Sequence, residues 1–158
     1  MMNRAWIKYA VALLTAAGLV ALWTLRPGMD VSAPSATPLH VEADCDSALR
    51  ACAARSDSVD IALQLGPPVR PMQVFTIQVR TLRGTLGADA RVDVQFQMRD
   101  MDMGINRYRL AIDADGVWRG SALLPVCSSG RSDWIAQVEI STAKRRWTAE
   151  LPFTVVPP

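Results

Sequence analysis

Three methionines occur within six residues of the chain, at positions 98, 101 and 103. Thioether sulfur is a soft, neutral ligand that suits Cu(I), and it does not oxidise to disulfides in an oxidising compartment. We expect Met101 and Met103 to project from one side of an extended segment, and a bend near Gly104 to bring Met98 towards them. The spacing therefore predicts a Cu(I) site. The alternative is that these methionines fill gaps in the core, which fits Met98 best because it continues the apolar face of a predicted strand.

The chain has three cysteines, which cannot all pair with one another. Cys45 and Cys52 enclose six residues, a loop short enough for a disulfide to close. An exported domain meets an oxidising environment, so we predict this disulfide and a free thiol at Cys127. Cys127 is then a fourth candidate ligand for Cu(I). A buried core thiol and an intermolecular disulfide are the alternatives for this residue.

The residue types favour a binding protein over an enzyme. The chain has one histidine, His40, no C-x-x-C motif and no His or Lys evidently placed to activate the Cys127 thiol, which argues against a thiol oxidoreductase. We expect His40 to be solvated, with a metal ligand as the alternative. With 17 Lys+Arg against 15 Asp+Glu, the chain lacks the concentrated basic face that nucleic-acid binding needs.

An apolar segment near the N-terminus predicts membrane anchoring. Residues 9–25 contain no charge, and a run of about 17 to 25 apolar residues suffices for a membrane-spanning helix. Arg4 and Lys8 precede the run, so the positive-inside rule puts residues 1–8 in the cytoplasm. The chain after Arg26 is then expected on the periplasmic side of a bacterial inner membrane. A cleaved signal peptide is the alternative, but bulky residues follow the apolar run where cleavage needs small ones.

The remaining chain divides into a linker and a β-rich domain. Residues 26–43 are rich in Pro, Ser, Ala and Thr and predict a linker, followed by a periplasmic domain over 44–158. Within that domain we expect a short helix or a tight loop over 44–55. Period-two alternation then predicts about seven strands, over 59–65, 74–79, 92–98, 108–112, 117–124, 134–140 and 147–155. This spacing favours an all-β fold, an immunoglobulin-like antiparallel β-sandwich.

Two arginines follow the methionine segment in the chain. Arg107 and Arg109 are expected on a solvated strand face, and pairing with Asp100 and Asp102 is the alternative. Neither arrangement by itself indicates a ligand.

The methionine segment, MRDMDMGIN, is followed by Gly116-Val117-Trp118 and by Trp134-Ile135-Ala136-Gln137-Val138. Over about residues 58–156 the chain resembles the YtkA-like family of exported β-sandwich domains. The resemblance implies an immunoglobulin-like fold and a role in copper handling or in the assembly of a respiratory copper enzyme, with an assembly factor as partner. The chain departs from the family at Leu124-Pro125-Val126-Cys127, where a methionine-containing strand is commoner. A structural or interaction domain of a membrane complex, without a metal, is the alternative function.

Overall fold

The computed structural model describes residues 14–15, 35–101, 104, 106–126 and 130–156 of two compact units, 1–33 and 34–158. In the first unit, Leu14 and Thr15 are helical. Among the described residues, no helix is long and apolar enough to cross a membrane. Apart from these two positions, the predicted cytoplasmic segment 1–8 and the predicted anchor 9–25 lie outside the described residues.

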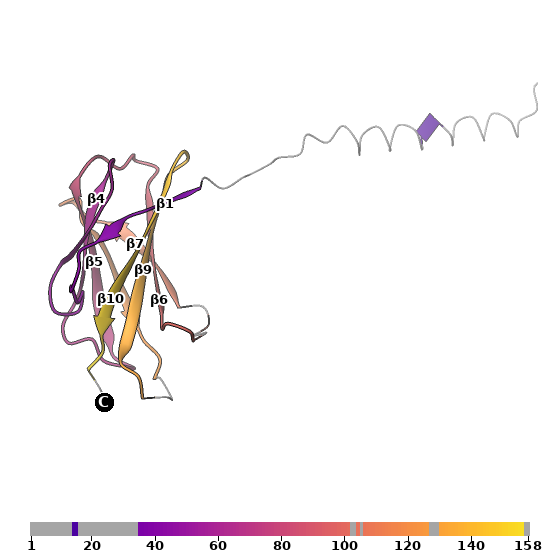
Figure 1. Ribbon diagram of the computed structural model, residues 1–158. Helices are drawn as coiled ribbons and strands as arrows, with labels where there is room; N and C mark the ends of the chain where they lie inside the picture. The colour runs from indigo at the N-terminus through magenta and orange to yellow at the C-terminus, as the bar shows by residue number, and fades with distance from the viewer. Residues whose placement is uncertain (1–13, 16–34, 102–103, 105, 127–129, 157–158) are drawn as a thin grey trace, which may run out of the picture. The chain divides into compact units, whose positions relative to one another are not determined.

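The second unit is all-β (Figure 1). Its strands are β1 (Ala36–Pro38), β2 (His40–Val41), β3 (Cys52–Arg55), β4 (Asp60–Leu65), β5 (Val74–Arg83), β6 (Arg91–Gln97), β7 (Arg107–Ile112), β8 (Trp118–Leu123), β9 (Asp133–Ser141) and β10 (Arg146–Thr154). The seven strands expected from the sequence are present as β4 to β10. Three further strands precede them, so the described part of the unit has ten strands instead of about seven.

The N-terminal part of the sheet includes residues that we expected in the linker. Residues 36–41 form β1 and β2, so the compact unit begins at Pro34 and not at residue 44. β1 pairs with β10 in parallel, and β2 pairs with β3 in the antiparallel sense. Between them Leu39 is buried, and its amide donates to the carbonyl of Thr148 at 2.7 Å. Two strands of three and two residues are too short for alternation to reveal them in the sequence.

The ten strands form one mostly antiparallel sheet in the order β1-β10-β9-β6-β7-β8-β5-β4-β3-β2. β2, at one edge, approaches β10, which is next to the other edge, so the sheet curls back on itself and is nearly closed like a barrel (Figure 1). β7 joins the two halves. It pairs with β6 from Arg107 to Leu110 but with β8 only at Ala111 and Ile112.

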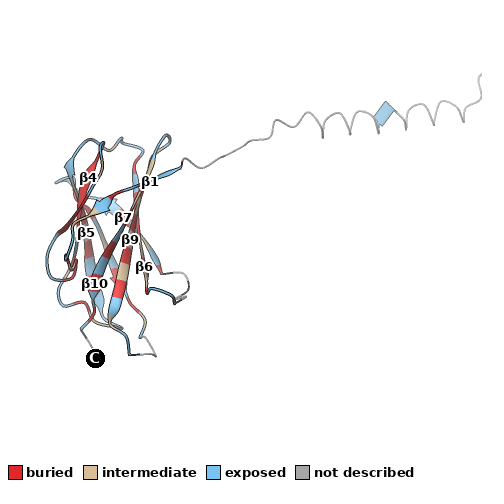
Figure 2. Ribbon diagram, viewed as in Figure 1, coloured by how far each residue is buried: buried red, intermediate tan, exposed pale blue. Residues whose placement is uncertain are grey.

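The core lies inside the curled sheet (Figure 2). The clearest alternation of buried side chains with more exposed ones occurs along β5, β9 and β10. Phe96 of β6 is fully buried, and the rings of Phe75, Tyr108 and Phe153 surround it with centroids 5.5–5.9 Å away. Such offset and edge-on ring contacts add to the free energy gained from burial alone. Phe96 lies two residues before Met98 in the chain.

An ion-pair network holds the outer face of β6. The carboxylate of Asp93, with 6% of its side chain exposed, accepts from Arg109 at 3.1 Å and from Arg107 at 3.3 Å. Arg107 also contacts Glu139 of β9 at 3.3 Å. Burial opposes the ionisation of Asp93, but the hydrogen bonds and charges of both arginines outweigh it and lower its pKa. Both arginines are exposed, as expected, but they pair with a carboxylate on the neighbouring strand that sequence reasoning did not consider.

Candidate functional site

The methionine segment leaves β6 through a tight turn from Met98 to Met101. The amide of Met101 donates to the carbonyl of Met98 at 3.4 Å, and the two residues form an isolated antiparallel bridge. Asp100 has a φ of 60°, which the third residue of a type II turn requires. Partners in an antiparallel pair carry their side chains on the same face, with Cβ atoms roughly 5 Å apart. The turn therefore starts the Met98 and Met101 side chains in the same direction.

The bend that brings these residues together differs from the one we expected. It lies at Arg99 and Asp100, before Met101, whereas the sequence placed it near Gly104. Gly104 also has a positive φ, 67°, so a second change of direction follows. The extended segment expected to carry Met101 and Met103 includes residues outside the described ones, so that expectation stays a prediction.

The two methionines differ in burial. Met98 is 3% exposed and belongs to the core, as the gap-filling alternative expected, while Met101 is half-buried and packs against the same core. Their shared face thus lies at the boundary between the apolar interior and solvent. A bound ion at this boundary would be partly shielded from water while still within reach of a partner.

The connection that contains Cys127 starts and ends at the end of the sheet where the Met98–Met101 turn lies, which we call the methionine end. β8 finishes next to the start of β7, because the hydroxyl of Tyr108 donates to the carbonyl of Leu123 at 2.7 Å. β9 begins next to the methionine turn, because Arg131 donates to the carbonyl of Arg99 at 3.2 Å. Met103 and Cys127 themselves lie outside the described residues, so their participation stays a prediction.

Arg131 makes further contacts that sequence reasoning did not assign. Its guanidinium donates to both carboxylate oxygens of Asp133, at 3.0 and 2.5 Å. These hydrogen bonds hold the pKa of Asp133 below its ordinary value. The Arg-x-Asp spacing was the available signal, since residues i and i+2 of an extended segment point to the same side.

The side-chain amide of Asn106 lies at the methionine end of the sheet. The residue is 7% exposed, and among the described residues no partner accepts from its amide Nδ2. Its backbone carbonyl accepts from the amide of Phe96 at 2.9 Å, which fixes its backbone beside β6. A buried donor without a partner is costly, and such a group in a folded protein calls for a specific explanation. No local pattern indicated it, because burial of this side chain depends on the packing of the whole sheet.

Exposed apolar side chains also lie at the methionine end of the sheet. We define the apolar rim as Met72, Val74, Leu123, Val126 and Val156, which are between 36% and 71% exposed. Val74 and Leu123 are direct partners on β5 and β8. The amide of Met72 donates to the carbonyl of Leu124 at 2.9 Å, which holds it next to them. This grouping was also missed, since its members come from separate loops and strands.

Cys45 and Cys52 lie at disulfide distance, as predicted, with Cα atoms 5.7 Å apart. Both residues are buried. The loop that they close is held by Asp46, whose carboxylate accepts from the amide of Ala48 at 2.8 Å and from the amide of Thr154, at the end of β10, at 2.9 Å. The pair therefore stabilises the scaffold and is not one of the candidate copper ligands.

The donor set fits a soft metal ion better than a hard one. Within the described ranges, no three His, Cys, Asp or Glu side chains come together in a way that could hold a metal ion. His40 is exposed on β2. The candidate ligands that the structure does describe are the sulfur atoms of Met98 and Met101, which suit Cu(I) and not Mg²⁺ or Ca²⁺.

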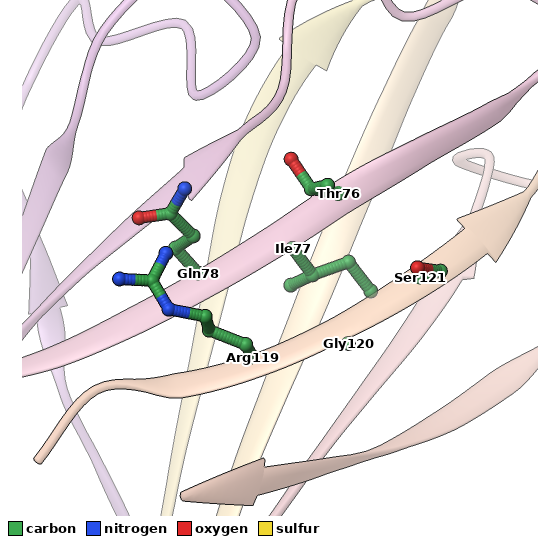
Figure 3. Close-up of a pocket in the computed structure, with 6 residues that line it drawn as sticks. All are labelled: Thr76, Ile77, Gln78, Arg119, Gly120 and Ser121. Carbon is green, nitrogen blue, oxygen red and sulfur yellow. The ribbon is translucent and has the colours of Figure 1, made fainter. Parts of the chain in front are cut away.

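A shallow hollow also lies on the outer face of the sheet, over β5 and β8 (Figure 3). It is lined by Thr76, Ile77, Gln78, Arg119, Gly120 and Ser121. The guanidinium of Arg119 donates to Asp113 at 2.5 Å, so its charge is already paired. None of the residues that we selected from the sequence lines this hollow, and we assign no ligand to it.

No protein-family model, curated protein or solved structure matches this chain. The resemblance to YtkA-like domains therefore stays a prediction. The function of the domain has to be inferred from the geometry of the methionine end.

Proposed function

We propose that this domain is a non-catalytic binding module that holds one Cu(I) ion at the methionine end of the sheet. The observation that carries the proposal is the Met98–Met101 bridge, which starts two thioether side chains on one face at the edge of the core. Neutral sulfur ligands next to an apolar interior favour a soft monovalent ion, because no anionic oxygen has to be desolvated with it.

We propose that Met103 and Cys127 complete the ligand set. Both belong to connections, β6–β7 and β8–β9, whose described ends lie at the methionine end. Thiolate and thioether sulfur together are ligands that select Cu(I). Asn106 would contribute a hydrogen-bond donor beside the site, not a ligand, since Cu(I) does not favour amide donors.

The proposed location is the bacterial inner membrane, with residues 9–25 as the anchor and the domain in the periplasm. The Cys45–Cys52 pair supports an oxidising compartment. The chain enters the sheet at Ala36, opposite Arg146 at the start of β10, while the methionine end lies beyond the last residue of that strand. Nine residues of β10 separate the two ends by roughly 30 Å. The site would therefore be accessible to a partner, for which we propose an assembly factor of a respiratory copper enzyme.

The fold that we propose is immunoglobulin-like. β5 pairs with β8 and β6 pairs with β9, although β5 and β6 are consecutive in the chain. Exchanges of this kind are typical of Greek-key sandwiches. β1 to β3 would then be additions in front of the common strands.

The test is an anaerobic Cu(I) titration of the full chain in detergent against a chromophoric Cu(I) chelator. We expect one bound ion per chain, and an affinity that falls by more than about tenfold when Met101→Leu and Met103→Leu are combined. Met72→Leu, a change at an exposed methionine of the apolar rim, is the matched control and should leave the affinity unchanged. A wild-type chain that does not compete with the chelator would overturn the proposal.

A second candidate is an interaction domain that binds a membrane complex without a metal. The apolar rim favours it, because grouped exposed apolar side chains mark interaction surfaces. Under this alternative, complex formation should survive the Met101→Leu and Met103→Leu changes and be lost in Val74→Lys. The opposite pattern would favour the copper proposal.

A further inference from the structure

We propose that Arg131 is a positioning residue, which fixes the geometry of the Met98–Met101 pair by holding the turn between them. This role rests on the proposed Cu(I) function of that pair. Arg131 acts through the backbone, because its guanidinium donates to the carbonyl of Arg99 inside the turn.

Arg131 is itself held on the rigid part of the sheet. Its guanidinium forms a two-point contact with Asp133, the first residue of β9. Asp133 pairs with Thr154 of β10, and the neighbouring carbonyl of Ser132 accepts from the amide of Val155 at 2.9 Å. A planar guanidinium bound at two points has little rotational freedom, so its remaining donors keep a fixed direction.

One of those donors reaches the carbonyl of Arg99 at 3.2 Å. This carbonyl belongs to the central peptide of the Met98–Met101 turn. Type I and type II turns differ mainly by a flip of that peptide, and only the type II form puts the third residue at a positive φ. Asp100 has that positive φ, which few residues other than glycine adopt, although aspartate does so more readily than most. The hydrogen bond from Arg131 to the central peptide stabilises this type II form.

The backbone pairing across this turn is short. Met98 and Met101 form an isolated bridge outside the named strands, and its hydrogen bond of 3.4 Å is longer than is usual for a backbone amide. Without the contact from Arg131 the turn loses a restraint on its central peptide, so it can open and move Met101 away from Met98, whose own position is fixed by burial. The two sulfur atoms would then no longer be available to one ion at the same time.

The experiment uses Arg131→Gln and Arg131→Lys in the full chain, with Arg99→Gln as the matched control. Arg99→Gln removes a positive charge at the same end but leaves the backbone carbonyl that Arg131 contacts. Both arginines are exposed, so we expect folded variants, which near-UV circular dichroism checks. The readouts are Cu(I) affinity, the number of sulfur ligands from X-ray absorption, and the amide resonance of Met101 in metal-free protein.

We expect Arg131→Gln to lower Cu(I) affinity by about 10- to 100-fold, as changes in groups that orient metal ligands do, and to lower the number of sulfur ligands. Its metal-free Met101 amide resonance should shift, Arg131→Lys should recover part of the affinity, and Arg99→Gln should match the wild type. Unchanged affinity and an unshifted Met101 resonance in Arg131→Gln would overturn the positioning role. If the wild type itself binds no Cu(I), the proposed function fails instead, and the positioning role fails with it.

Discussion

Strand β6 and the turn that follows it are both held by arginine side chains, but with different consequences. Asp93, in the middle of β6, lies between the ladders to β7 and β9, and its two arginines add to pairing that the backbone already fixes. In the turn after β6 the backbone pairs at an isolated bridge, and Arg131 contacts the central peptide. In the sheet an arginine contact adds stability, whereas in the turn it selects geometry. Changes in the sheet should therefore alter the free energy of unfolding, and changes in the turn should alter binding.

Among changes in the sheet, Phe96→Ala should lower the free energy of unfolding most. Phe96 is fully buried among three aromatic rings, so its removal leaves a cavity that the curled sheet cannot collapse to fill. We expect a loss of about 3–5 kcal/mol in the free energy of unfolding, measured by urea denaturation. Met72→Ala, at an exposed position, should cost far less. A loss below about 1 kcal/mol for Phe96→Ala would mean that the aromatic cluster contributes little to the stability of the fold.

The double change Cys45→Ala and Cys52→Ala should have the second-largest effect on the free energy of unfolding. Closing a loop of this length restricts the unfolded chain, and its loss should cost about 2–3 kcal/mol. Reduction of the wild-type protein should lower the urea midpoint to a similar extent. Since neither cysteine is a candidate ligand, Cu(I) affinity in the folded variant should not change. A large drop in affinity would show that the two regions are not independent.

Asp93→Asn should cost about 1–2 kcal/mol at neutral pH, because it weakens contacts with two arginines that are themselves 40% and 63% exposed. The pKa of Asp93 is lowered on folding, so its carboxylate stabilises the fold above its unfolded pKa of about 4. This contribution disappears as the pH falls through the lowered folded value. The difference between wild type and variant in urea denaturation should thus be full at about pH 7 and shrink below about pH 4. Asp115→Asn, in an exposed turn, should leave the free energy of unfolding at neutral pH close to the wild-type value.

The sequence predicted those features that depend on neighbours in the chain. Period-two alternation revealed β4 to β10, and the short spacing of Cys45 and Cys52 revealed their pairing. It did not reveal β1, whose partner strand is more than 100 residues away, or the contact between Arg131 and Arg99, which are 32 positions apart. It did not reveal the turn after Met98 either, in which Asp100 adopts a positive φ. Few residues other than glycine adopt this conformation, so the residues around Asp100 do not by themselves indicate it.

The smallest effect on stability, and the clearest separation of the turn from the sheet, is expected for Met101→Leu. Leucine conserves most of the volume of methionine, and Met101 is only half-buried, so the free energy of unfolding should stay within about 0.5 kcal/mol of the wild type. Met98→Leu is the paired variant: at 3% exposure it should cost more, up to about 1.5 kcal/mol. Both should weaken Cu(I) binding, because each removes one sulfur from the same face. If Met101 were present for packing alone, Met101→Leu would leave Cu(I) affinity unchanged. A loss of affinity without a loss of stability separates the function of the turn from that of the sheet.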